Sequence, residues 1–228
     1  MMIEVNGAAL FYEKSGTGSP IVLLHGNGED HHIFDELSAR LANDFTVYAV
    51  DSRNHGQSGK TGDYSYATMA EDIHKFIEVL KLGRVDLLGF SDGAIVSLIL
   101  AMNHGEAVGA MALLGVNLKP EDFTGDSYRF IEETYEKTKD PLFKLMLEEP
   151  HIELDAVRGI DIPVLLIAAE NDLYKPETFT RLASALPDAT LKIMRGHEHG
   201  SYIVGRDLLY PDLIHFFRQA RPGRGTKT

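Results

Sequence analysis

The sequence predicts an α/β fold, a three-layer α/β/α sandwich in which helices cover both faces of a mostly parallel sheet. Two observations carry this prediction. Short apolar segments alternate with segments whose apolar residues recur at helical spacing, which is typical of βα units. Several apolar segments are almost continuous in Val, Ile, Leu and Ala, as strands buried on both faces are.

The sheet is predicted to have eight strands and to begin antiparallel. Asn6-Gly7 joins the first two strands and supplies the positive φ angles of a type I′ hairpin turn. Most later strands are separated by helical segments, so we expect them to run parallel. The predicted strands span residues 3–5, 9–14, 21–24, 46–50, 85–88, 110–114, 164–168 and 190–194.

Helical periodicity is clearest in residues 68–82, where five apolar residues share one face: Met69, Ile73, Phe76, Ile77 and Leu80. Gly83 follows in the position of a glycine that ends a helix. Pro176 is typical of a first helical turn and predicts a helix that reaches about residue 186.

Residues from about 117 to 158 interrupt the alternation and are predicted to form a short helical cap inserted between two strands. They contain no strand pattern but two amphipathic helices, the second beginning at Asp140-Pro141 with the aspartate as N-cap. We therefore expect a single domain over residues 1–228 that carries this cap. Residues 221–228 are predicted to be a disordered tail.

Composition narrows the class of partner and leaves the oligomeric state open. A formal net charge of −12 without a basic cluster argues against binding to nucleic acid or to an anionic membrane surface. The chain has no cysteine, which excludes disulfides and a cysteine nucleophile. It has no secretory signal pattern and no apolar run long enough to span a membrane, so we expect a cytoplasmic protein.

Residues 89–93, Gly-Phe-Ser-Asp-Gly, follow an apolar strand and precede a helical segment. This strand–turn–helix context is the one that a nucleophile elbow requires, because the tight turn lifts the serine above the sheet. We therefore predict that Ser91 is a nucleophile.

A serine hydroxyl needs a base that is itself oriented by an acid. Asp172 and His199 follow two later strands, in the chain order Ser, Asp, His, at the sheet edge where open α/β sheets place their sites. They are the predicted acid and base. Glu170 and His197 are the alternatives, and the residues alone leave both open.

Acyl transfer also requires N–H groups directed at the developing oxyanion. His25-Gly26-Asn27-Gly28 follows a predicted strand, and its glycines let the backbone approach a substrate closely. The predicted oxyanion hole consists of the backbone N–H groups of Asn27 and Asp92, and we interpret His25 as structural. The Asp92 carboxylate has two interpretations: it complements the helix dipole, which we favour, or it attracts a substrate ammonium.

These segments, together with residues 51–58, resemble the α/β-hydrolase superfamily over roughly residues 3–217. The resemblance implies a serine hydrolase with the predicted Ser–Asp–His triad, and the sequence around His199 is more similar to the family's histidine loop than the His197 register is. One departure is Asn54, where the family has glycine. Asparagine tolerates a left-handed backbone, so we expect the turn to survive.

The combined prediction is a carboxylesterase that acts on small acyl esters through an acyl-enzyme, without a cofactor or a metal. Alternatives are an aminoacyl-ester or peptidase-like hydrolase, a lactonase, a C–C bond hydrolase and, in another class, a slow-turnover ligand receptor. The short cap favours short acyl chains. The residues predicted to line the substrate pocket are Phe123, Tyr128, Phe130, Phe143 and Met146.

Overall fold

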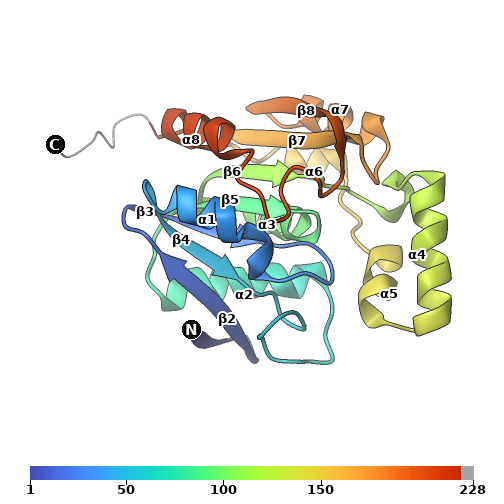
Figure 1. The fold of residues 1–228 in the computed structure, drawn as a ribbon, viewed down its shortest axis with the longest axis horizontal. Coiled ribbons are helices and arrows are strands. Elements are labelled where there is room, and N and C mark those ends of the chain that lie inside the picture. The colour runs from blue at the N-terminus through green and yellow to red at the C-terminus, as the bar shows by residue number, and fades with distance from the viewer. Residues whose placement is uncertain (222–228) are drawn as a thin grey trace.

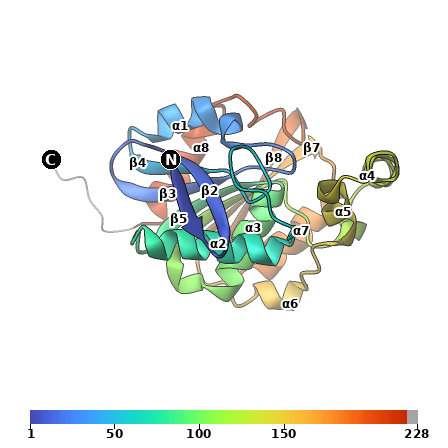
Figure 2. The ribbon, with the colours of Figure 1, turned by 90° about the horizontal axis from the view of Figure 1, so that it is seen from below.

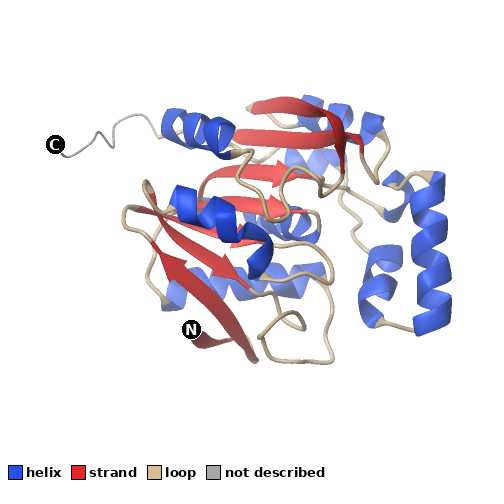
Figure 3. Cartoon of the chain, viewed as in Figure 1, coloured by secondary structure: helices blue, strands red, loops and turns tan. Residues whose placement is uncertain are grey.

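The computed structural model describes residues 1–221, which form an eight-stranded sheet between two layers of helices (Figures 1 and 3). The strand order is β1-β2-β4-β3-β5-β6-β7-β8. The first two pairings are antiparallel and the remaining five are parallel, which confirms the predicted fold class. The strands are β1 (Met2–Val5), β2 (Ala8–Ser15), β3 (Ser19–Leu24), β4 (Phe45–Val50), β5 (Val85–Phe90), β6 (Val108–Leu114), β7 (Val164–Asn171) and β8 (Ala189–Glu198).

Two apolar clusters, one on each face of the sheet, hold the layers together. Helices α1 (Asp35–Leu41) and α8 (Tyr210–Gln219) pack on one face (Figure 2). Four helices pack on the other: α2 (Tyr66–Val79), α3 (Asp92–Asn103), α6 (Leu154–Val157) and α7 (Pro176–Ala185). Burial of both faces explains why the central strands are almost continuously apolar.

The turns follow the local sequence, with one correction. Asn6 and Gly7 both have positive φ angles, 47° and 74°, and join β1 to β2 as the Asn-Gly pair predicts. Asn54 has a φ of 68°, so it occupies the left-handed region as expected. The prediction that Gly83 ends α2 is wrong. Lys81 takes the left-handed position, with a φ of 52°, and the Leu82 N–H donates to the Ile77 carbonyl in a Schellman motif.

All regular secondary structure between β6 and β7 is helical. It contains η3 (Pro120–Asp122), α4 (Gly125–Thr138), α5 (Pro141–Glu148) and α6. Asp140 caps α5 by accepting from the Leu142 N–H at 2.9 Å, as its sequence predicts. Helices α4 and α5 pack against each other and project beyond the end of the sheet (Figure 1). Their inward side joins a third apolar cluster that includes Ile131, Met146 and Tyr174.

The end of the described chain differs from the prediction. Arg221, assigned to the tail, forms an ion pair with the buried Asp86 at 2.6 Å. The rest of the predicted tail, residues 222–228, lies outside the described residues. None of the helices among residues 1–221 combines the length and the apolar composition that crossing a bilayer requires.

Candidate active site

Ser91 lies at a sharp turn between β5 and α3. Its φ and ψ angles of 52° and −116° are unusual for a residue with a side chain, and such strain concentrates at functional sites. The two flanking glycines make the turn possible. A Cβ at Gly89 would lie 2.3 Å from the Gly93 carbonyl oxygen, and one at Gly93 would lie 2.1 Å from the Leu24 carbonyl oxygen. The turn therefore depends on backbone packing directly against backbone.

The structure brings Ser91, His199 and Asp172 together in one hydrogen-bond chain. His199 Nε2 lies 3.0 Å from Ser91 Oγ, and His199 Nδ1 lies 2.7 Å from Asp172 Oδ1. The second carboxylate oxygen of Asp172 accepts from the Ala169 N–H at 2.9 Å. Gly115, at the end of β6, leaves room for the imidazole, since a Cβ there would lie 2.5 Å from its Cε1 atom.

Neither alternative residue takes part in this chain. Glu170 is exposed, and its carboxylate accepts from the Gly196 N–H at 2.7 Å. His197 lies within β8, which extends four residues beyond its predicted end, and its Nδ1 atom contacts Ser201 Oγ at 3.0 Å. His199 is thus the residue just past the strand end, where the sheet edge faces Ser91.

The loop that follows β3 lies beside Ser91. His25 is buried within it. Its Nδ1 atom lies 2.8 Å from the Gly26 carbonyl, and its Nε2 atom accepts from the Ser52 N–H. Burial, reinforced by His55, lowers the pKa of His25 to about 4, so the ring is neutral and joins two loops. Asn27 lines the same cavity as Ser91.

Asp92 is turned away from that cavity. Its carboxylate accepts from Asn27 Nδ2 at 2.9 Å and also hydrogen bonds to the buried Tyr66 hydroxyl. The side chain is 5% exposed, and burial raises its pKa despite these bonds. Asp92 is also the first residue of α3, where a backbone N–H has no acceptor within the helix.

The cavity above Ser91 has a volume of about 300 Å³ and is mostly apolar. Two of the five predicted pocket residues, Phe143 and Met146 from α5, line this cavity. The prediction is wrong for the other three. Phe123 is buried against Tyr174, and Tyr128 and Phe130 lie on the exposed side of α4. The residues that line the cavity are Gly26, Asn27, Glu29, Phe90, Ser91, Phe143, Met146, Leu173, His199 and Gly200.

Several of these residues carry no clear signal in the sequence. Phe90 occupies the variable position of the G-x-S-x-G motif, and its ring lies 4.9 Å from that of His199. Leu173 directly follows Asp172, so its position could have been inferred from the strand end. The buried Tyr174 lies with its ring edge-on to His199 at 5.4 Å, and its hydroxyl bonds to Ser91. Glu29 lies in a polar loop, where carboxylates are usually solvated, so nothing in the sequence distinguishes it as a cavity residue.

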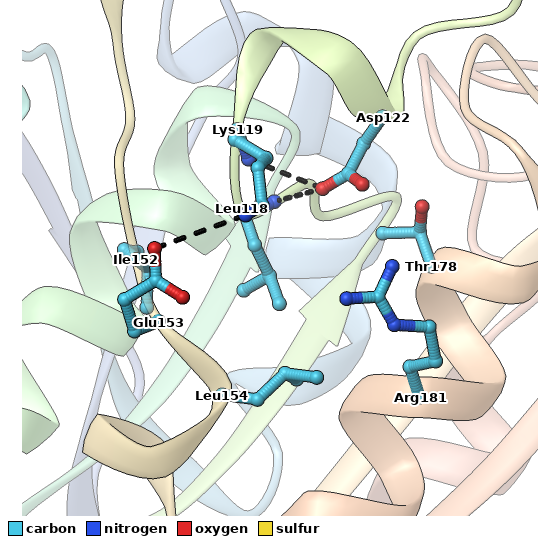
Figure 4. A pocket seen from close by; sticks show the side chains of 8 residues that line it. All are labelled: Leu118, Lys119, Asp122, Ile152, Glu153, Leu154, Thr178 and Arg181. Atoms are coloured by element: carbon cyan, nitrogen blue, oxygen red, sulfur yellow. Dashed lines mark hydrogen bonds and ion pairs between the residues drawn. The ribbon is translucent and has the colours of Figure 1, made fainter.

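A second cavity lies where the cap segment meets α7 (Figure 4). It has a volume of about 40 Å³, enough for a few water molecules, and is lined by none of the residues above. Its Asp122 carboxylate accepts from two backbone N–H groups, which ties down the chain that leaves β6. The lining residues are Leu118, Lys119, Asp122, Ile152, Glu153, Leu154, Thr178 and Arg181.

Two groups of histidine and acidic residues could offer metal ligands, and both lie outside the active-site cavity. They are Asp30, His31 and His32, and Glu71, His74 and His104. In each group a histidine already bonds to a carboxylate: His31 to Asp51 at 2.7 Å and His104 to Glu71 at 2.8 Å.

Comparison with known proteins places the chain in a family. A sequence model of the alpha/beta hydrolase fold matches residues 19–144, more than half of the chain. The hydrolase YraK of Bacillus subtilis is 32% identical over 112 residues, which is 48% of this chain and 41% of that protein. Ethanol acetyltransferase 1 of Cyberlindnera jadinii is 30% identical over 135 residues, 55% of this chain and 40% of that protein. The chain thus spans less than half the length of these curated relatives.

Solved structures match along nearly the whole chain. A meta-cleavage product hydrolase from Pseudomonas fluorescens has a TM-score of 0.82 at 19% identity and covers 97% of this chain and 98% of its own. A thermophilic esterase from Thermogutta terrifontis has a TM-score of 0.78 at 18% identity, with coverage of 96% and 97%. At such identities the likeness concerns the fold alone. Together with the sequence match, it establishes that this chain belongs to the alpha/beta hydrolase fold family.

Proposed function

We propose that the protein is a serine hydrolase that cleaves small carboxylic esters. The observation that carries the proposal is the hydrogen-bond chain from Ser91 through His199 to Asp172, which ends at the strained turn beside the cavity. Asp172 accepts from Nδ1–H of His199 and so favours the tautomer whose Nε2 atom can take a proton. This is the arrangement that activates a serine hydroxyl.

In the proposed reaction, His199 takes the Ser91 proton as the serine oxygen attacks the ester carbonyl. The backbone N–H groups of Asn27 and Asp92 stabilise the oxyanion, and the histidine returns the proton to the departing alcohol. Water then attacks the acyl-enzyme and gives a proton to His199. The acid leaves, and Ser91 regains its proton.

The cavity supports a small acyl group. Its volume of about 300 Å³ is at the lower end of that of small-molecule sites, and Phe143 and Met146 from α5 close it on the cap side. Each additional methylene gains about 0.8 kcal/mol only where it can be buried. We therefore expect acyl chains of about two to six carbons to be preferred.

A fluorophosphonate probe and p-nitrophenyl butyrate test this proposal. The wild-type protein should be labelled and should hydrolyse the ester, whereas Ser91→Ala should lose labelling and several powers of ten in kcat. Ser184→Ala, an exposed serine on α7, is the matched control and should behave as wild type. Labelling that persists in Ser91→Ala would contradict the assignment. A ring-cleavage product offered as a second substrate separates ester cleavage from C–C cleavage.

A further inference from the structure

Glu29 places a carboxylate in the same cavity as Ser91 and His199. The reaction proposed above has no use for it. A Cβ built at Gly26 would lie 2.7 Å from Glu29 Oε2 and 3.1 Å from Ser91 Cβ. The carboxylate and the serine therefore flank the same backbone position, and both face the space that an acyl group would occupy.

The carboxylate is held in place on one side only. Glu29 Oε2 accepts from the Gly26 N–H at 2.9 Å, and the Glu29 N–H closes the turn onto the Gly26 carbonyl at 3.3 Å. Among residues 1–221, the Gly26 N–H is the only hydrogen-bond donor to this carboxylate. The second oxygen is thus available to a bound molecule.

The surroundings of Glu29 compensate its charge only in part. Burial raises the pKa of its carboxyl to about 7, although the Gly26 hydrogen bond and His199 oppose this shift, and the nearby Asp92 and Asp30 add to it. Among the described residues that line the cavity there is no lysine and no arginine. A bound cation would supply the missing partner, and a net charge of −12 favours its approach.

Asp92 cannot serve in this role. It is closer to Ser91 in sequence, but its carboxylate is 5% exposed, already bonds to Asn27 and the buried Tyr66, and does not line the cavity. An ammonium group at Asp92 would have to displace these contacts. Glu29 can accept an ammonium group on its second oxygen and keep its hydrogen bond to the Gly26 N–H.

We propose that Glu29 forms a binding subsite for a protonated amine on the carbon next to the ester carbonyl, so that the preferred substrates are small aminoacyl esters. The inference rests on the proposed hydrolase function. The Glu29 carboxylate and Ser91 flank the same backbone position, so its second oxygen is positioned for a substituent close to the carbonyl that Ser91 attacks. The same carboxylate repels acyl groups that carry a negative charge.

The test compares two esters that differ in the ammonium group, L-alanine benzyl ester and benzyl propionate, at pH 7.0, where an α-amino group with a pKa of about 7.7–8.0 is mostly protonated. The ammonium also makes the ester intrinsically more reactive, so the readout is the ratio of the two kcat/KM values in each variant. In Glu29→Gln this ratio should fall about tenfold to a hundredfold below the wild-type ratio. Glu36→Gln, which removes an exposed carboxylate on α1, is the control and should keep the wild-type ratio.

A second measurement does not depend on the variant. Propylammonium should inhibit benzyl propionate hydrolysis by the wild type at least about tenfold more strongly than 1-propanol does. Equal inhibition, or an unchanged ratio in Glu29→Gln, overturns the subsite while ester hydrolysis itself stands. Failure to hydrolyse either ester, together with no fluorophosphonate labelling, overturns the proposed function and the subsite with it.

Discussion

The turn at Ser91 and helix α5, which packs on α4, border the same cavity, but the turn and the helix pair are built in different ways. At the turn, backbone packs on backbone, and the space beside Gly93 is too small for a methyl group. In the helix pair, side chains make the contacts, and the Phe130 side chain is 65% exposed. Under the proposed function, we expect changes at the turn to affect whether a reaction occurs, and changes in the helix pair to affect which substrates are preferred.

The largest effect is expected from the histidines near the turn. His199→Ala should lower kcat by several powers of ten, because His199 is the group that contacts Ser91 Oγ. His197→Ala should stay within a few-fold of wild type, since His197 contacts Ser201 instead. Kinetics with p-nitrophenyl butyrate check both variants. The opposite order would move the base to His197.

Backbone packing at the turn predicts the next largest effect. Gly93→Ala should destabilise the fold by at least about 2 kcal/mol, because the new methyl group would lie 2.1 Å from the Leu24 carbonyl oxygen. Gly62→Ala is the control, since nothing lies within 4 Å of a Cβ there, and it should leave stability within about 0.5 kcal/mol of wild type. Urea denaturation measures both. Equal stability of the two variants would mean that the turn is far more plastic than its packing indicates.

Glu29 predicts a pH-dependent effect on stability. In the folded state its pKa is raised to about 7, so between about pH 4.5 and 7 the folded chain binds more protons than the unfolded chain. Its contribution to stability therefore falls as pH rises through this window and remains unfavourable above it. Glu29→Gln should gain about 2–3 kcal/mol over wild type at pH 8 and little at pH 5, measured by urea denaturation. A gain of the same size at both pH values would contradict this account.

The smallest effect concerns the helix pair. Phe143→Ala enlarges the cavity and should shift the preference toward longer p-nitrophenyl esters, with about a tenfold gain for the octanoate relative to the acetate. Phe130→Ala, on the exposed side of α4, should leave the chain-length profile unchanged. A wild-type profile still rising at the laurate ester would show a longer groove than the structure has.

Local sequence predicted the fold and the position of Ser91 because both depend on short-range patterns. The glycines at 89 and 93 are required by contacts within a few residues of the turn or with the adjacent strand. Asp172 and His199 were predicted because each follows a parallel strand, and parallel strands end at one edge of the sheet. The sequence could not exclude Glu170 and His197, because the hydrogen bonds that join His199 to Asp172 and Ser91 depend on how distant segments meet in the folded chain.

The pocket was predicted less well, for a physical reason. Helical periodicity shows that one face of α4 is buried, but it does not identify what that face packs against. Phe123 is buried against Tyr174 rather than the cavity, and α5 alone supplies the cap side chains that line it. Glu29 was missed because its distinctive property is desolvation by distant parts of the chain, which no local pattern records.

The side chain of Asn27 has a consequence for motion. Its amide nitrogen donates to Asp92 Oδ2 at 2.9 Å and to the Leu142 carbonyl in the first turn of α5 at 3.1 Å. The Asn27 side chain thus connects three segments: the loop after β3, the first residue of α3 and the first turn of α5. We therefore expect any outward displacement of α5 to break the bond to Leu142 and to disturb Asn27, whose backbone N–H belongs to the proposed oxyanion hole.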